Sequence, residues 1–356
     1  MTTPDDVLQR GIDEHRYAGV AAQVLRDGDV VHRSVLGDAS NRSGPRESLW
    51  ETARFDIASC TKAVATTASI MALVTAGELR VDDPLSVYLP SSHPDITLRH
   101  LLTHTAGLVE WQPLYLASRT REEAVAVATS LPLRYAVREG RHYSDLGLII
   151  TGAVVERVTG ERLDGAVHRL VTEPLGMTST GYGPVEPAAA VAYGHGDDIE
   201  RAMIRDGEPY PVTMDRTVPP RFRRDWVRGE VSDGNAFHAM HGISGHAGLF
   251  STLDDLTRFG TALLDESPVW SRTVLEAFLT PGADGQAVGF WWQPAASGPA
   301  YGHPGFTGAR LLVDPAARSV AVLLSNRLHV MAPGERVPPD IAPDWQAYLR
   351  ATGFAA

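Results

Sequence analysis

Apolar residues near the amino terminus follow first a helical and then a strand-like pattern. Over residues 4–16 they recur with the spacing of one helix face, which predicts a short amphipathic helix. The apolar-rich segments Val20–Leu25 and Val30–Leu36 flank the dipeptide Asp27-Gly28. Asp-Gly between two apolar segments is typical of a tight turn, so we expect a β-hairpin here.

Helical patterns dominate the middle of the chain. The run 63–74 is rich in alanine and almost wholly apolar or small, which predicts a buried helix that ends at Gly77. Prolines interrupt residues 184–235, where we expect a long irregular loop. Further helices are expected at 97–103, 121–130, 146–158 and 161–173.

Strand patterns return towards the carboxyl terminus. Strands are expected at Val288–Trp292, Ala309–Val313 and Ser319–Ser325, with helices at 253–265, 271–279 and 340–351. Because strands lie at both ends of the chain, we predict that they pair into one antiparallel sheet. The helical region is then inserted between strands of the same sheet.

This order predicts an α/β (α+β) fold, an antiparallel sheet flanked by helices with an inserted helical domain. A chain of 356 residues is long enough for two such parts that share one cleft. We expect residues 1–58 and 245–356 to form a discontinuous sheet domain. Residues 59–244 are expected to form a mainly helical domain, with the irregular loop at about 184–235.

Charge and composition narrow the classes of partner. The formal net charge is −11, whereas nucleic acids and anionic membranes bind basic surfaces, so we expect neither as a partner. The amino terminus lacks a signal-peptide pattern, and no apolar run approaches the ~20 residues that span a bilayer. The single cysteine, Cys60, excludes an internal disulfide. We therefore expect a cytoplasmic protein, of an oligomeric state that the sequence leaves open.

The basic residues are almost all arginine. Of the 32 lysines and arginines, only Lys62 is a lysine. Compositional drift in a GC-rich genome accounts for the loss of surface lysines, but not for the position of the one that remains. Arginine stays protonated in proteins, whereas a desolvated lysine can give up its proton. A lone lysine is therefore expected where the chemistry needs a neutral amine.

Lys62 ends the motif Ser59-Cys60-Thr61-Lys62 at the start of the predicted buried helix. Residues three apart share a helix face, so we expect the amine within reach of the Ser59 hydroxyl. A neutral amine in this position activates a serine as a nucleophile, and the helix amino terminus favours developing negative charge. A serine N-cap followed by a surface lysine is the plainer alternative, against which the uniqueness of Lys62 argues.

A second motif, Tyr143-Ser144-Asp145, precedes the helix expected at 146–158. A phenol beside an ammonium group has its ionised form favoured, so Tyr143 suits acid–base chemistry at an acylated serine. Taken alone, the motif fits better a tyrosine at a helix start with Asp145 as the N-cap.

A third motif is the glycine-rich segment Gly302–Gly308, which contains His303 and precedes the strand expected at Ala309–Val313. Glycines allow a strand backbone to approach a ligand closely. A main-chain N–H from this segment can pair with that of Ser59 to form an oxyanion hole. A simple glycine-rich turn is the alternative.

Together these motifs, an S-x-x-K, a Y-x-[N or similar] and a late [K or H]-x-G, resemble those of the serine β-lactamases and penicillin-binding proteins. Their separations, about 80 and then about 160 residues, are most similar to those of class C β-lactamases and the related esterases and D-aminopeptidases. The segments 98–108, 173–177 and 245–252 look like this family too, so the resemblance covers roughly residues 10–330. It implies a sheet domain and a helical domain with the site between them.

The resemblance implies a role for each motif residue. Ser59 would be the acylated nucleophile and Lys62 its base. Tyr143 would carry the proton to the leaving group and activate the deacylating nucleophile. The N–H groups of Ser59 and Phe306 would form the oxyanion hole.

Substrate binding is expected at Asp145, His303, Gly305 and Trp111. Asp145 stands where the family usually has asparagine, and His303 where the β-lactamases usually have a lysine that binds a substrate carboxylate. Both departures weaken the case for penicillin-like substrates and resemble esterase-like relatives. Trp111 is expected near the cleft, where an apolar acyl group would lie.

We therefore expect a serine hydrolase that forms an acyl-enzyme on Ser59 and acts on an ester or amide of a small molecule, as an esterase rather than a true β-lactamase. A transacylase that passes the acyl group to an amine or alcohol is the alternative, and a penicillin-binding module or D,D-peptidase is least favoured. The G-x-S-x-G motif of α/β-hydrolases is missing from the sequence. We expect no cofactor and no metal, since His100 and His104 have helical ligand spacing without an H-E-x-x-H motif.

Overall fold

A seven-stranded antiparallel sheet joins the two ends of the chain in the computed structural model, which describes residues 2–42, 44–93, 95–187, 190–219 and 221–354. The strand order is β3-β2-β1-β12-β11-β10-β9. Its strands are β1 (Gly19–Arg26), β2 (Asp29–Ser40), β3 (Glu47–Ser48), β9 (Trp291–Ala295), β10 (Gly298–Pro304), β11 (Arg310–Asp314) and β12 (Ser319–Ser325).

The predicted hairpin and the predicted pairing of the chain ends are both confirmed. Asp27 and Gly28 both have positive φ, 52° and 89°, as the turn that joins β1 to β2 requires. β1 pairs antiparallel with β12, from Val20 opposite Ser325 to Arg26 opposite Ser319. The first and last strands of the chain therefore meet at the centre of the sheet.

Two strand predictions near the carboxyl terminus need correction. The strand expected at Val288–Trp292 begins only at Trp291, and β10 was not predicted at all. β10 reads Gly-Pro-Ala-Tyr-Gly-His-Pro, with few of the β-branched residues that favour strands. Its pairing with β9 and β11 on either side overrides that weak local preference.

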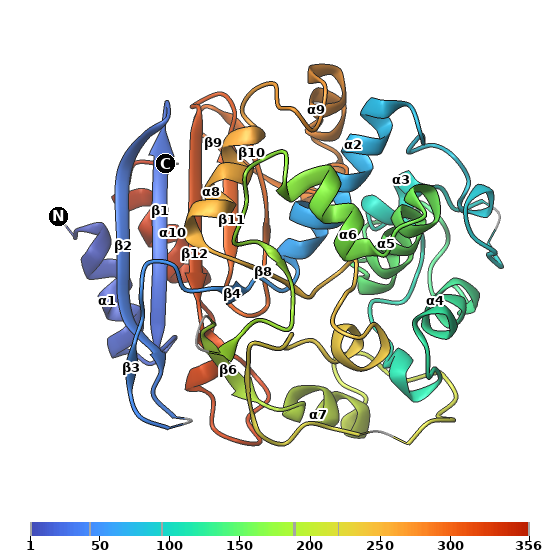
Figure 1. Ribbon diagram of the computed structural model, residues 1–356, viewed down its shortest axis with the longest axis horizontal. Helices are drawn as coiled ribbons and strands as arrows, with labels where there is room; N and C mark the ends of the chain where they lie inside the picture. The colour runs from blue at the N-terminus through green and yellow to red at the C-terminus, as the bar shows by residue number, and fades with distance from the viewer. Residues whose placement is uncertain (1, 43, 94, 188–189, 220, 355–356) are drawn as a thin grey trace.

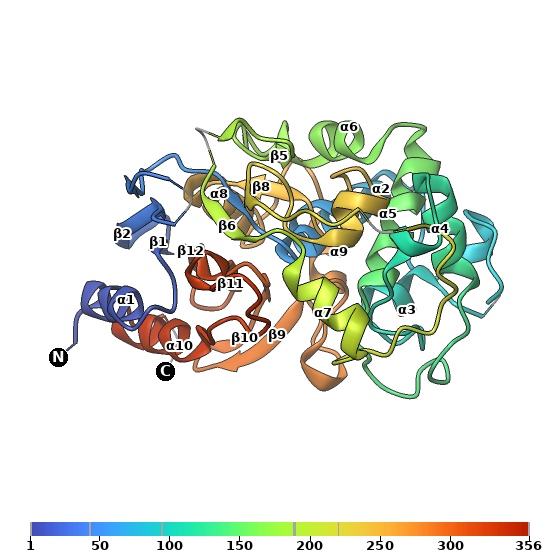
Figure 2. The same cartoon turned by 90° about the horizontal axis from the view of Figure 1, so that it is seen from below.

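Helices cover both faces of the sheet. α1 (Pro4–Asp13) and α10 (Ala342–Ala351) lie side by side on one face, and α8 (Leu253–Ala262) lies on the other (Figures 1 and 2). The α1/α10 side has its own core, in which Leu8 and Tyr348 pack with Val24 of β1. α9 (Arg272–Phe278) packs against the buried helix α2 (Ala68–Ala76).

The helical region confirms most of the predicted helices. The run 63–74 forms a π-helical segment, η1 (Lys62–Thr67), that continues into α2 (Ala68–Ala76). α2 ends at Gly77 with the left-handed φ of 75° that glycine adopts without strain. The others are α3 (Leu98–Leu102), α4 (Arg121–Ser130), α5 (Asp145–Thr159), α6 (Leu163–Val167) and the π-helical η4 (His168–Thr172).

The prediction of an irregular loop over 184–235 is wrong in part. This segment contains β6 (Ala192–His195), α7 (Asp198–Asp206) and β7 (Trp226–Arg228), with β6 and β7 paired. Acidic residues at the start of α7 and Gly207 at its end are typical of helix ends. The prolines on either side of this segment favoured the prediction of a loop instead. α7 lies between the sheet and the helical region (Figure 2).

A small second sheet crosses the predicted domain boundary. It pairs β4 (Phe55–Asp56) with β8 (Leu249–Ser251) and β8 with β5 (Gly181–Tyr182). β5 comes from the predicted helical domain, and the other two strands come from the sheet domain. The division at 58/59 and 244/245 therefore stays a prediction.

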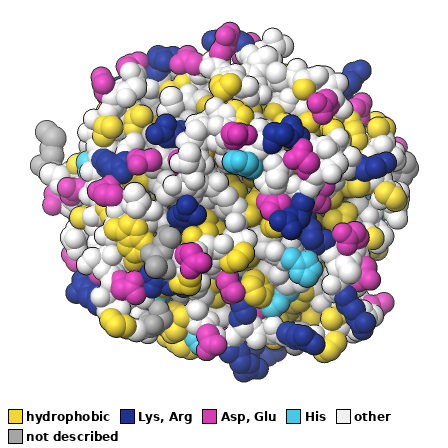
Figure 3. All heavy atoms as spheres, in the orientation of Figure 1, with side chains coloured by type: hydrophobic (Ala, Val, Ile, Leu, Met, Phe, Trp, Pro, Cys, Tyr) yellow, Lys and Arg dark blue, Asp and Glu magenta, His cyan; other side chains and the backbone are white. Residues whose placement is uncertain are grey.

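The surface in Figure 3 carries acidic and basic side chains intermixed over one face. Exposed ion pairs in the described part of the chain include Arg33 with Asp254 and Arg318 with Asp265. Within the described ranges, every helix is too short or too polar to cross a membrane.

Candidate active site

The Ser59 hydroxyl and the Lys62 amine meet, as the spacing predicted. Lys62 Nζ donates a hydrogen bond to Ser59 Oγ at 2.8 Å. Ser59 immediately precedes the helical turn at Cys60 and Thr61, and the Lys62 N–H bonds back to the Ser59 carbonyl at 3.0 Å. The two side chains therefore lie on one face of the same turn.

A buried carboxyl group holds the turn that presents Ser59. Asp56 accepts hydrogen bonds from the N–H groups of Ala58 at 2.8 Å and of Ser232 at 2.7 Å. Burial raises the pKa of Asp56 to about 6, although these two bonds oppose the shift. Ala58 adopts a positive φ of 45°, a conformation that is strained for a residue other than glycine. The surrounding contacts thus fix a backbone shape that the local sequence does not favour.

The surroundings of Lys62 do not favour a neutral amine. Its side chain is 1% exposed, and Nζ lies 2.7 Å from Asp145 Oδ1 and 3.3 Å from the main-chain oxygen of His246. Burial alone would lower the pKa of Lys62, but the charge of Asp145 and the contact with Tyr143 raise it above the ordinary lysine value. The pairing with Asp145 therefore favours the ammonium form of Lys62 in the resting site.

Tyr143 lies beside this ammonium group. Lys62 Nζ is 5.0 Å from the centre of the Tyr143 ring, and the tyrosine also interacts with Ser59. Burial raises the pKa of Tyr143, with Asp145 adding to the rise and Lys62 opposing it. Tyr143 is accordingly a neutral phenol at rest.

Asp145 is not the N-cap of α5, as the plainer interpretation of its motif supposed. Ser144 occupies the N-cap position, and the Asp145 side chain bonds to Lys62 instead. Ser144 Oγ donates to the Val109 carbonyl at 2.6 Å, and the Ser144 N–H donates to His104 Nδ1 at 3.1 Å. These bonds position the start of α5, so that Tyr143 and Asp145 both face Lys62.

The glycine-rich segment at the end of β10 lies directly against the Ser59 turn. A Cβ atom on Gly305 would lie 2.5 Å from the Ile57 carbonyl oxygen, so only glycine fits there without movement. Cys60 Sγ donates to the His303 carbonyl at 3.1 Å. No described residue bonds to the N–H of Ser59 or of Phe306, which leaves both proposed oxyanion donors available.

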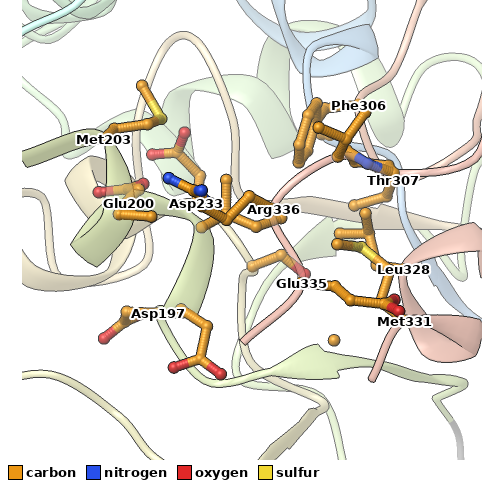
Figure 4. Close-up of a pocket in the computed structure, with 18 of the residues that line it drawn as sticks. Asp197, Glu200, Met203, Asp233, Phe306, Thr307, Leu328, Met331, Glu335 and Arg336 are labelled. Carbon is orange, nitrogen blue, oxygen red and sulfur yellow. The ribbon is translucent and has the colours of Figure 1, made fainter. Parts of the chain in front are cut away.

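A cavity of about 710 Å³ opens beside Ser59. Tyr143, Asp145, Trp111 and Phe306 line it with the nucleophile. In Figure 4, Glu200 and Met203 of α7 face Phe306 and Thr307 across this cavity. The sequence had placed Trp111 near a cleft, and this 4%-exposed side chain does border one.

Comparison with known proteins identifies the family. The model of the family described as Beta-lactamase matches residues 4–343. The chain belongs to the beta-lactamase family. It is 31% identical to esterase EstB of Burkholderia gladioli, over 88% of this chain and 80% of that protein. It is 29% identical to the N-acetylmuramyl-L-alanine amidase of Bacillus subtilis strain 168, over 91% of this chain and 80% of that one.

The fold agrees with this assignment. A penicillin-binding protein from Bacillus halodurans superposes with a TM-score of 0.70 at 22% identity, covering 97% of this chain and 99% of that one. The predicted mixed fold, with an antiparallel sheet flanked by helices, is therefore the fold of the family.

Sequence reasoning missed part of the site of this beta-lactamase family member. α7 contributes Ile199, Glu200 and Met203 to the cavity, and Asp233 comes from the segment that follows β7. The helical spacing of Ile199, Ala202 and Met203 between acidic residues and Gly207 was the signal that could have revealed α7. The position of α7 beside the cavity depends on tertiary packing, which the local sequence pattern does not encode.

Acidic side chains gather on this side of the cavity. Burial raises the pKa of Glu200 to about 8, and the nearby charges of Asp233 and Asp197 add to the rise. Burial would raise the pKa of Asp233, but His246, the Ala236 N–H and Lys62 together lower it to about 2.

Asp145, Asp233 and His246 bring potential metal-ligand atoms within 4.8 Å of one another. The Lys62 ammonium already lies 2.7 Å from Asp145. His246 uses its ring nitrogens on Ser244 Oγ at 2.8 Å and on Asp233 Oδ1 at 2.9 Å. Asp145 is therefore already paired with the Lys62 ammonium, and Asp233 already contacts His246.

The histidine pair with metal-ligand spacing makes structural contacts. His100 Nδ1 accepts from the Thr97 N–H at 3.2 Å, and its Nε2 lies 2.9 Å from Arg138 Nε. The other member, His104, accepts from the Ser144 N–H and is 4% exposed. The four-residue spacing of these two histidines therefore fits structural roles: His100 caps the start of α3, and His104 holds the backbone at the start of α5.

Proposed function

We propose that this chain is a serine hydrolase that cleaves an ester or amide of a small molecule through an acyl-enzyme on Ser59. The observation that carries the proposal is the 2.8 Å contact between Ser59 Oγ and Lys62 Nζ beside a cavity of substrate size. Membership of the beta-lactamase family and similarity to an esterase and an amidase support the reaction class.

In the proposed mechanism, Ser59 Oγ attacks the substrate carbonyl carbon while the N–H groups of Ser59 and Phe306 stabilise the oxyanion. The reactive form is the minor population in which Lys62 is a free amine and accepts the serine proton. Tyr143 then delivers a proton to the leaving group. Water then attacks the acyl-enzyme carbonyl and gives its proton to the Tyr143 phenolate, while the Lys62 ammonium returns a proton to the departing Ser59 oxygen, so that all three groups regain their starting forms.

The substrate class follows from charge. Asp145 and Asp233 border the cavity on the nucleophile's side, and Lys62 is already paired with Asp145. A substrate carboxylate in this cavity would lose hydration, while the basic side chains among its described lining residues, His195 and Arg336, already contact Asp198 and Asp206. We therefore favour esters and amides without a carboxylate in this cavity over penicillin-like substrates.

The experiment is intact-protein mass spectrometry after incubation with p-nitrophenyl esters of increasing acyl length and with a β-lactam. We expect an acyl adduct on the peptide that contains Ser59, and its loss in Ser59→Ala. Ser69→Ala is the matched control, since Ser69 is buried in the helix that follows Ser59 and its hydroxyl bonds to none of the described residues. An adduct that persists in Ser59→Ala, or p-nitrophenol release at the wild-type rate in that variant, would disprove the proposal.

Added amines and alcohols separate hydrolysis from acyl transfer. A hydrolase releases free acid at a rate that these acceptors do not change. An acceptor that speeds p-nitrophenol release and appears in the product would make the transacylase the correct function.

A further inference from the structure

Part of the cavity beside Ser59 is bounded by apolar side chains from two segments that lie far apart in the chain. Met203 comes from α7, whereas Leu328 and Met331 come from the segment 327–338, which follows β12. In Figure 4, Met203 lies on one side of the cavity, and Leu328 and Met331 lie on the other. We call these three side chains the apolar region of the cavity.

Two exposed hydrophobic side chains border the same cavity. Phe306 is 45% exposed and Val337 is 84% exposed, and both line it. Single exposed hydrophobic side chains are ordinary, but several that border one cavity are typical of a ligand-binding groove. Phe306 also carries one of the two proposed oxyanion N–H groups. The apolar border of the cavity therefore begins at the reaction centre.

Charged residues on the same two segments already have partners. The Glu200 carboxyl group of α7 bonds to the Tyr115 hydroxyl at 2.7 Å and accepts from the Gly234 N–H at 2.6 Å. Arg336, in the segment 327–338, pairs with Asp206. A charged substrate group would compete with these contacts, whereas an apolar group only displaces water from apolar surface.

The proposed mechanism places the two halves of the substrate against different elements. Tyr143 gives its proton to the leaving group, so the leaving group lies against Tyr143. This tyrosine packs against Trp291 of β9 and His303 of β10, with ring centres 5.6 Å and 6.0 Å away. The apolar region belongs to other elements. The acyl group, on the other side of the scissile bond, therefore extends away from Tyr143.

We propose that the substrate carries an apolar acyl chain of medium length, which runs past Phe306 and ends between Met203 and Met331. Methionine side chains are unbranched and adaptable, which suits contact with a flexible chain. A volume of about 710 Å³ is that of sites for drug-sized ligands and is far more than an acetyl group fills. The inference rests on the proposed function, because the chain belongs to the acyl group that Ser59 accepts.

Two series of esters test the acyl chain. p-Nitrophenyl esters from acetate to dodecanoate lengthen the acyl group, and acetate esters of alcohols of the same lengths lengthen the leaving group. We expect kcat/KM to rise about fourfold for each CH₂ group between butanoate and octanoate. A steeper rise in the acyl series supports the inference. The absence of a rise with acyl length, or an equal or steeper rise in the alcohol series, would overturn it.

Met203→Ala removes apolar surface from the cavity and keeps a good helix former in α7. We expect it to lower the ratio of activity on octanoate to that on acetate by about tenfold. This ratio does not depend on the fraction of enzyme that is folded. Met214→Ala is the matched control, because Met214 is also half-buried but does not line the described cavity. A ratio that falls no further in Met203→Ala than in Met214→Ala would overturn the inference.

A binding measurement separates this inference from the proposed function. If no ester acylates Ser59, the proposed function fails by itself. Calorimetric titration of Ser59→Ala with octanamide and with acetamide then decides on the apolar region. Tighter binding of octanamide, weakened by Met203→Ala more than by Met214→Ala, would support it. Octanamide that binds no more tightly than acetamide, or that is weakened equally by both substitutions, would overturn it.

Discussion

The carboxylate of Asp145 lies 2.7 Å from the ammonium nitrogen of Lys62, which in turn lies 2.8 Å from the Ser59 hydroxyl. The chain's single lysine is thus paired with an acid at the point where an uncharged amine was expected. The pair keeps a buried charge satisfied. It also makes the reactive free-amine form of Lys62 a minor population at neutral pH.

Replacing Asp145 by asparagine is expected to shift the pH profile of the enzyme. Removal of the negative charge lowers the pKa of Lys62, since Asp145 is the main group that raises it. More Lys62 is then free amine at a given pH, so the ascending limb of kcat/KM moves to lower pH and activity at neutral pH rises. Kinetics from pH 5 to 10 measure this. Asp265→Asn, which alters a surface pair with Arg318, is the control and should leave the profile in place.

Lys62→Arg is expected to reduce acylation by between about 10²- and 10⁴-fold, the usual contribution of a general base. Arginine does not give up its proton in a protein, so it keeps the positive charge but loses the base. Stopped-flow release of p-nitrophenol gives the acylation rate, and circular dichroism checks the fold. Lys62→Met, which has neither charge nor base, should lose a similar amount. Near-wild-type acylation by the arginine variant would contradict the role of Lys62 as base.

Gly305→Ala is expected to impair both stability and activity. The new Cβ would lie 2.5 Å from the Ile57 carbonyl, so the end of β10 must move away from the Ser59 turn. Overpacking of this kind costs about 1–3 kcal/mol of unfolding free energy. Thermal unfolding and kcat measure the two effects. Gly181→Ala is the control, because a Cβ there has no neighbour within 4 Å.

Glu200→Gln is expected to make the stability less dependent on pH. The pKa of Glu200 in the folded protein, about 8, lies above the ordinary value of 4.5, so folding favours its protonated form. Its contribution is fully present below pH 4.5 and is lost as the pH rises through 8. The variant should therefore gain unfolding temperature relative to wild type at pH 8.5, with a smaller difference at pH 5. An equal difference at both values would contradict the raised pKa.

Local sequence patterns were sufficient to predict much of the secondary structure of the scaffold. The Asp27-Gly28 hairpin, the apolar helix that ends at Gly77, and the strand at Ser319–Ser325 all follow from short-range conformational preference. β10 and α7 were missed for opposite reasons. β10 lacks strand-forming residues and depends on its two neighbours, whereas α7 has a helical pattern that surrounding prolines concealed.

The sequence by itself determined the nucleophile candidate, because Ser59 and Lys62 are three residues apart and one helical turn brings them together whatever the rest of the chain does. Tertiary structure decided the charge state of that lysine, since Asp145 is more than 80 residues away in the chain and reaches Lys62 only when α5 packs beside η1. The same packing placed α7 along the cavity and Arg141 beside Trp291. Covalent spacing fixes contacts within a turn, whereas electrostatic surroundings sum over groups that only folding brings close.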